Sequence, residues 1–143
     1  MNESKKLWAV YQAERKLRGL QSKLNAAERF LAEQERQLVS IGQQQDSLTS
    51  QLRQIEASAK EGEDEVARID ARIEKLREEM NVARTNKEYQ AFLVEINALK
   101  IERGRAEEEA IGLLEKAEAI KAEIGQSTEN QTERNRVRDV ALQ

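Results

Sequence analysis

The stretch Arg84-Thr85-Asn86-Lys87-Glu88-Tyr89 decides the fold, because two long heptad patterns of apolar residues meet there and fall out of phase. The pattern that leads up to Ala83 would next reach Lys87 and Gln90, which are both polar. A second pattern begins instead at Tyr89. The change of register favours two helices that are joined at this point.

The same stretch carries a signal for the start of a helix. Thr85-Asn86-Lys87-Glu88 fits a capping box, in which the Thr85 hydroxyl accepts from the Glu88 amide and the Glu88 carboxylate reaches back to the Thr85 amide. A helix start that coincides with a break in register predicts a chain reversal. We therefore predict an antiparallel hairpin with its tip at residues 83–86. The first helix would cover about residues 4–82, and the second would run from about 86 to 125 or further.

Upstream of the tip, apolar residues recur alternately every three and four residues, and only Gln34, Gln45 and Gly62 interrupt them. Such a run predicts one buried stripe along a left-handed coiled coil, and we call its positions the seam. The seam consists of Val10, Ala13, Leu17, Leu20, Leu24, Ala27, Leu31, Gln34, Leu38, Ile41, Gln45, Leu48, Leu52, Ile55, Ala59, Gly62, Val66, Ile69, Ile73, Leu76, Met80 and Ala83.

Downstream of the tip, the second register is weaker and contains an arginine and three alanines. Gly125 opens a polar segment that favours fraying or an end of the second helix. The complete pattern is typical of an all-α protein, a single long antiparallel coiled-coil helical hairpin over residues 1–143. The second seam consists of Tyr89, Phe92, Ile96, Leu99, Arg103, Ala106, Ala110, Leu113, Ala117, Ile120 and Ile124, followed by the polar Ser127, Gln131, Arg134 and Arg138.

The two seams differ in length. If the turn centres between Arg84 and Thr85, Ile124 lies opposite about Gln45 and Gln143 lies opposite about Ala26. The seam from Val10 to Leu24 then has no partner within the chain. Either the chain belongs to a longer protein whose second helix continues, or two molecules cover each other's seam as a homodimer. The polar C-terminal segment favours the first interpretation.

Composition argues against an enzyme. The 143 residues are 36% charged and 3% aromatic and include no proline, cysteine or histidine. This is the composition of a long solvated helix, and it lacks the commonest general base, thiol nucleophile and metal ligands. The carboxylates Glu107, Glu108 and Glu109 are adjacent on a predicted helix and point about 100° apart, so they cannot converge on one cation. We expect no catalytic residues, no metal site and no cofactor in this chain.

Positive charge is concentrated near the N-terminus, although the net charge of the chain is −3. Lys5, Lys6, Arg15, Lys16 and Arg18 form a candidate basic patch that could contact nucleic-acid phosphates, against the alternative of ordinary solvated helix charge. Trp8 and Tyr11 lie in the same segment and are either a docking anchor or packing at the edge of the seam. The chain shows no signal peptide and no apolar run that could span a bilayer, so we expect no membrane association and a cytoplasmic protein.

The stretch Ala83-Arg-Thr-Asn-Lys-Glu-Tyr-Gln-Ala-Phe-Leu-Val-Glu-Ile96 resembles the hairpin tip of the bacterial C4-type zinc-ribbon family. The resemblance implies a coiled-coil hairpin that is followed by a C-terminal zinc ribbon with two Cys-x-x-Cys pairs. Because this chain has no cysteine, the zinc and the ribbon would belong to a region outside it. The matching positions are Arg84, Thr85, Asn86, Glu88, Tyr89, Ala91, Glu95 and Ile96, with Phe92 where the family usually has leucine.

The resemblance also implies association with transcription or nucleic acid, and for some members with alternative sigma factors and flagellar control. We expect a non-enzymatic interaction or scaffold module that presents its tip and basic base to a sigma factor, another transcription component or nucleic acid. The alternative is a structural rod or spacer, a parallel homodimer whose single helix runs through residues 84–88. Expected tip contacts are Arg84, Asn86, Lys87 and Gln90, with Thr85, Glu88 and Tyr89 shaping the turn.

Overall fold

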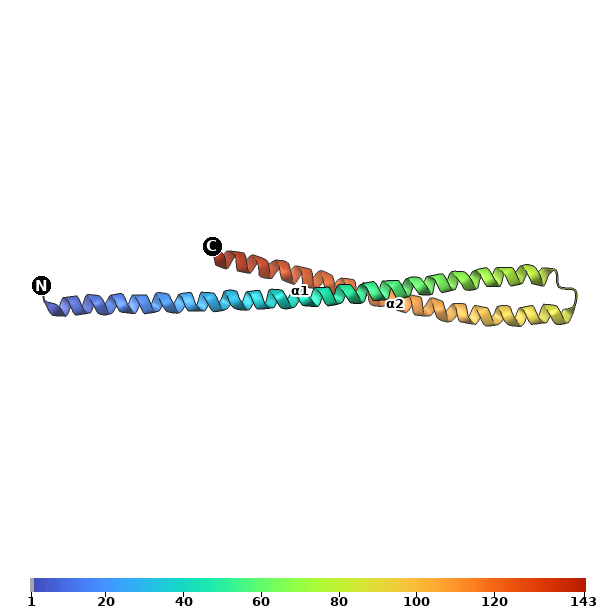
Figure 1. Cartoon of the computed structure of the whole chain (residues 1–143), viewed down its shortest axis with the longest axis horizontal. Coiled ribbons are helices and arrows are strands. Elements are labelled where there is room, and N and C mark those ends of the chain that lie inside the picture. Colours follow the sequence, from blue (N-terminus) through green and yellow to red (C-terminus); the bar gives the residue numbers. More distant parts are fainter. Residues whose placement is uncertain (1) are drawn as a thin grey trace. The chain divides into compact units, whose positions relative to one another are not determined.

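Two long helices account for nearly all of the part of the chain that the computed structural model describes, residues 2–143. Helix α1 spans Glu3–Asn81 and helix α2 spans Asn86–Leu142 (Figure 1). The helices pack against each other, and residues 2–143 contain no strand. The predicted all-α helical hairpin is confirmed. The alternative of one helix through residues 84–88 is wrong, because α1 has already ended where the two registers part.

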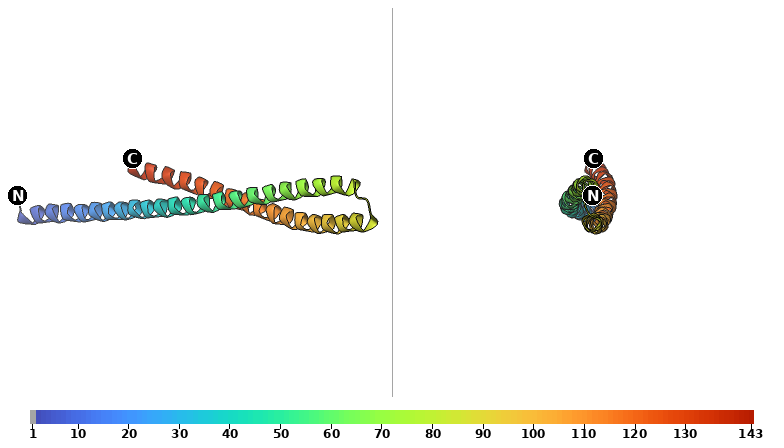
Figure 2. Two further views of the ribbon diagram at one scale, coloured as in Figure 1. Left: turned by 45° about the vertical axis from the view of Figure 1, so that its right-hand side comes forward. Right: turned by 90° about the vertical axis from the view of Figure 1, so that its right-hand side faces the viewer.

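The chain divides into two compact units, each of which takes a piece of both helices. The hairpin unit is Asp46–Gly125, and the terminal unit combines the residues up to Gln45 with Gln126–Gln143. Within the hairpin unit α1 and α2 lie side by side and run in opposite directions (Figures 1 and 2). Helix α1 has no proline to interrupt it and continues through Gly42 and Gly62, as the unbroken heptad phase predicted.

The core of the hairpin unit consists of seam residues. Ile69, Ile73 and Leu76 of α1 and Ile96 of α2 are buried together, and Leu76 is the most completely enclosed, at 1% exposed. Each of these residues belongs to one of the two predicted registers, so the registers do face each other. Three further seam residues, Met80, Phe92 and Leu99, pack against this cluster.

Farther from the tip, small residues bring the two helices close together. Ala59, Ala110 and Ala117 are buried. A Cβ placed on Gly62 would come within 3.2 Å of the Ala110 Cβ, which is tighter than an ordinary van der Waals contact. Gly62 interrupts the apolar pattern in the sequence, and in the fold it provides the space that this close approach needs.

In the terminal unit α2 does not stop at Gly125. It remains helical to Leu142, which corrects the expectation that the polar segment frays. The reason is that its polar seam meets the polar positions of α1. The Gln45 amide donates to Gln131 Oε1 at 3.3 Å and to Thr128 Oγ1 at 3.4 Å, and Arg138 donates to Glu35 at 3.1 Å.

The register also differs from the simple expectation that Ile124 lies opposite Gln45. Gln45 instead bonds to Thr128 and Gln131, which lie four and seven residues farther along α2 than Ile124. Side chains on a helix lean toward its N-terminus. On two antiparallel helices this lean moves contacts such as these toward higher residue numbers, an effect that counting from the turn leaves out.

The N-terminal part of α1 is not covered by any other segment of residues 2–143. Every residue from Asn2 to Phe30 is exposed, and burial begins only at Leu31. Leu17, Leu20 and Leu24 are 64%, 65% and 57% exposed although they continue the buried seam. The exposed part of the seam therefore extends a few residues farther than Leu24, to Ala27.

Candidate functional site: the hairpin tip and the N-terminal segment

The tip is a short connector, residues 82–85, between two helices that end in different ways. Helix α1 closes with two tight bonds, from the Val82 amide to the Glu79 carbonyl at 3.2 Å and from the Ala83 amide to the Met80 carbonyl at 3.1 Å. Such i→i+3 bonds satisfy the last carbonyls of a helix without a glycine. No described residue of the chain has a positive φ, so the reversal needs no left-handed position.

Helix α2 starts with the predicted cap, with one difference. The Glu88 amide donates to Thr85 Oγ1 at 3.2 Å, and the Tyr89 amide donates to the Thr85 carbonyl at 3.1 Å, so Thr85 is the N-cap. The Glu88 carboxylate, however, accepts from the Arg84 amide at 3.2 Å and not from the Thr85 amide. The connector turns the Arg84 N–H toward the start of α2, so the carboxylate satisfies the donor one residue earlier.

The predicted tip residues share one exposed end of the hairpin unit. Each of the seven is exposed in the structure, and Tyr89, although it begins the second seam, is still 41% exposed. The apolar cluster around Leu76 lies directly behind them and holds the helix ends. The capping bonds involve Arg84, Thr85, Glu88 and Tyr89, through the Arg84, Glu88 and Tyr89 amides, the Thr85 hydroxyl and carbonyl and the Glu88 carboxylate. The seven residues are Arg84, Thr85, Asn86, Lys87, Glu88, Tyr89 and Gln90.

The structure adds one tip residue that the sequence analysis did not select. Val82, the first residue of the connector, is 77% exposed. A signal was present, since Val82 is an apolar residue that falls outside the seam positions Met80 and Ala83. The tip thus combines an exposed aliphatic side chain with exposed arginine and lysine.

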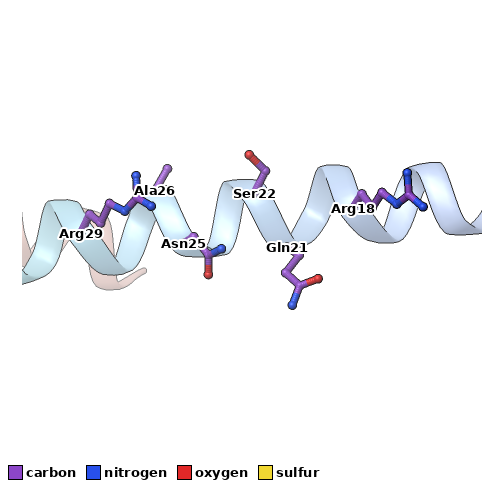
Figure 3. Close-up of a pocket in the computed structure, with 6 residues that line it drawn as sticks. All are labelled: Arg18, Gln21, Ser22, Asn25, Ala26 and Arg29. Atoms are coloured by element: carbon purple, nitrogen blue, oxygen red, sulfur yellow. The ribbon is translucent and has the colours of Figure 1, made fainter.

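The predicted basic patch lies wholly on exposed helix surface. No ion pair is found for Lys5, Lys6, Arg15, Lys16 or Arg18 among the described residues, so their charges face solvent without an acidic partner. Farther along the same helix, Arg18 and Arg29 border a shallow polar hollow of about 330 Å³ (Figure 3). The remaining residues that line it are Gln21, Ser22, Asn25 and Ala26.

Trp8 and Tyr11 stack on each other with ring centroids 5.6 Å apart. They are 61% and 53% exposed. In the heptad that places Val10 and Leu17 on the seam, both aromatic residues fall on the opposite side of the helix. This position argues against packing at the edge of the seam, and docking stays a prediction for this pair.

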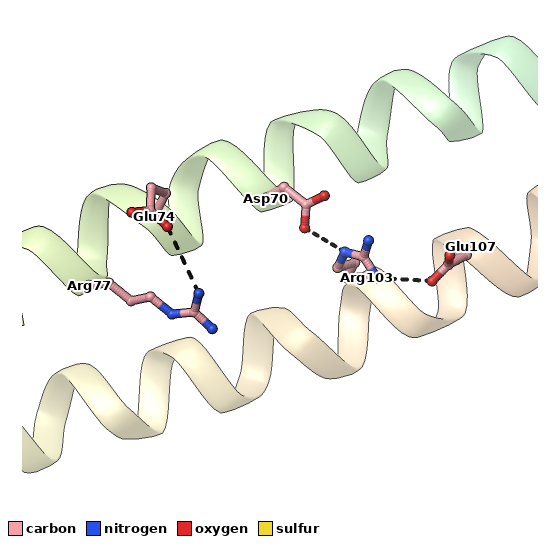
Figure 4. Close-up of polar contacts among 5 residues, drawn as sticks. All are labelled: Asp70, Glu74, Arg77, Arg103 and Glu107. Atoms are coloured by element: carbon pink, nitrogen blue, oxygen red, sulfur yellow. Dashed lines mark hydrogen bonds and ion pairs between the residues drawn. The ribbon is translucent and has the colours of Figure 1, made fainter.

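Acidic and basic side chains of the hairpin unit form ion pairs with each other and not a cation site. The Arg103 guanidinium bridges Asp70 at 2.5 Å and Glu107 at 3.0 Å, and Glu74 lies 3.9 Å from Arg77 (Figure 4). The pKa of Arg103 is raised, chiefly by the hydrogen bond that its guanidinium donates to Asp70. Arg103 is thus a seam position that turns outward to reach carboxylates on both helices. Among residues 2–143 no group of three histidine, cysteine or acidic side chains is placed to hold a metal ion.

No protein-family model, curated protein or solved structure matches the chain. No helix among the described residues is both long and apolar enough to cross a membrane. The zinc-ribbon family likeness therefore depends on the tip residues alone.

Proposed function

We propose that this chain is a non-enzymatic coiled-coil interaction module, which uses the hairpin tip to bind a protein partner of the transcription machinery. The observation that carries the proposal is the arrangement of the tip. An apolar core fixes both helix ends, the capping bonds fix the connector, and the side chains of Arg84, Asn86, Lys87 and Gln90 project from this rigid base. A preorganised exposed surface loses little entropy on binding.

The class of partner follows from the resemblance of residues 83–96 to the zinc-ribbon family. A sigma factor or another component of bacterial RNA polymerase is the partner that this resemblance favours. The zinc ribbon of that family would lie outside this chain, and the module would work in the cytoplasm. The tip would bind the partner through Lys87 and Arg84 for charge and Val82 and Tyr89 for apolar contact.

The test is binding of the full chain to purified bacterial RNA polymerase core enzyme and to purified sigma factors, measured by biolayer interferometry. The double substitution Asn86→Ala and Lys87→Ala should weaken the complex about tenfold or more, as expected for residues at the centre of an interface. Asn97→Ala with Lys100→Ala is the matched control, because both residues are exposed on α2 away from the tip.

A third variant distinguishes direct contact with the partner from an effect on the shape of the turn. Thr85→Ala should cost about 1 kcal/mol of stability by removing the cap hydroxyl, with affinity affected only through the shape of the turn. If the double substitution leaves the affinity for every one of these proteins unchanged, the tip only connects the two helices and does not contact the partner.

A second candidate function is nucleic-acid binding by the basic patch, which the absence of ion pairs around its residues favours. Binding to a short DNA duplex or an RNA hairpin, followed by fluorescence anisotropy, should weaken steeply with salt. Changing Lys5, Lys6, Arg15 and Lys16 to glutamine should abolish it. The same change at the exposed Lys75, Lys100, Arg105 and Lys116 should have little effect, and equal losses for the two sets would refute a specific patch.

A further inference from the structure

The exposed seam of α1, residues 7–30, is the largest feature that the tip function leaves unexplained. Its members continue the register that α2 buries from Leu31 onward, yet none of residues 2–143 covers them. They form one stripe of about two and a half heptads, in which three consecutive leucines lie between smaller residues. The stripe comprises Val10, Ala13, Leu17, Leu20, Leu24 and Ala27.

We propose that a second copy of this chain covers the stripe, so that residues 7–30 of the two copies pair as an antiparallel coiled coil. The stripe is complementary in side-chain size to a second copy of itself that runs in the opposite direction. Antiparallel pairing places Leu17 against Leu20 of the second copy, and Leu24 against its Ala13. Val10 similarly meets Ala27 of the second copy. Each of these outer layers combines one large and one small residue, as close packing requires.

A parallel pairing fits less well for two reasons. It would place Ala13 against Ala13 and Ala27 against Ala27, which leaves two layers underfilled. In addition, α2 already covers the same stripe of α1 beyond Leu31 within each terminal unit. Two parallel α1 helices would therefore have to separate from that point onward, whereas in the antiparallel pairing only the first turn of the second copy's α1 reaches it.

The flanks of the stripe also bear on the orientation. In the antiparallel pairing Phe30, which is 42% exposed, would cover Ala9 of the second copy. The same pairing brings Lys16 near Lys23 of the second copy, and this like-charge contact opposes it. Both lysines are exposed, so the repulsion is weak beside the burial of the leucines of the stripe.

Sedimentation equilibrium of the full chain tests the proposal. The chain should form a dimer whose dissociation constant rises about 100-fold or more with Leu20→Glu, because the substitution removes two buried leucines per dimer. Ser22→Glu adds the same charge on the outer side of the helix and should leave the dimer intact. Far-UV circular dichroism should show unchanged helix in both variants, since Leu20 makes no contact within the fold.

Lys23→Glu tests the orientation. In the antiparallel dimer it replaces two lysine–lysine contacts with two glutamate–lysine contacts, so the dimer should tighten about fivefold. In a parallel dimer Lys23 would face Glu28 of the second copy, and the same substitution would weaken association. Weakening, or a monomer at every concentration, overturns the proposal. The stripe contains no tip residue, so its failure would leave the proposed function intact, and tip substitutions should not change the dimer.

Discussion

The hairpin unit and the terminal unit are made from the same two helices, yet they are held together by different interactions. The hairpin unit buries isoleucine and leucine from both helices and closes around Gly62 with alanines. In the terminal unit the buried set includes Gln34 and Ser127, and the contacts between the helices include hydrogen bonds of Gln45 and Arg138. Apolar burial supplies most folding free energy, whereas polar pairs chiefly select one register.

This difference implies different roles for the two units. The hairpin unit has the stability to hold a rigid tip, because its apolar cluster begins at Met80, next to the end of α1, and at Phe92, less than two turns from the start of α2. The terminal unit combines a polar, weaker pairing with a long exposed stripe, which suits assembly with other chains. Two sets of substitutions can test this difference between the units.

The largest expected effect comes from truncating one core leucine in each unit. Leu76→Ala should lower the free energy of unfolding by about 2–5 kcal/mol, because Leu76 is only 1% exposed and a cavity would remain. Leu38→Ala, at a half-buried seam position of the terminal unit, should cost about 1 kcal/mol. Urea denaturation followed by far-UV circular dichroism measures both. Equal losses would contradict the contrast between the units.

Several features of the fold could be predicted from the sequence because they depend on local patterns. The break in register at Ala83 and the cap at Thr85 placed the reversal to within a residue or two, and the heptad phase identified Ile69, Ile73, Leu76 and Ile96 as core. The exposure of the N-terminal seam followed from counting residues on either side of the turn.

Other features depend on how the two helices are offset, which no local pattern encodes. The lean of the side chains toward each N-terminus shifted the contacts by about one helical turn. Only this offset pairs Gln45 with Gln131 and Arg103 with Asp70. Once those partners are known, both the polar continuation of α2 to Leu142 and the arginine within the seam have an explanation. The exposure of Val82 likewise depends on the path of the connector.

The smaller effect compares two glycines, one from each unit. No atom lies within 4 Å of a Cβ placed on Gly42, so Gly42→Ala should stabilise the chain by about 0.5–1 kcal/mol through helix propensity alone. A Cβ on Gly62 would meet the Ala110 Cβ at 3.2 Å, so the helices of the hairpin unit must move apart to accept it. Gly62→Ala should therefore gain nothing or lose stability, and Gly62→Val should cost about 1–3 kcal/mol by overpacking. Thermal unfolding of the three variants provides the measurement. If Gly62→Ala stabilised the chain as much as Gly42→Ala, the alanine layer would not be closely packed, and the two units would differ in polarity but not in packing.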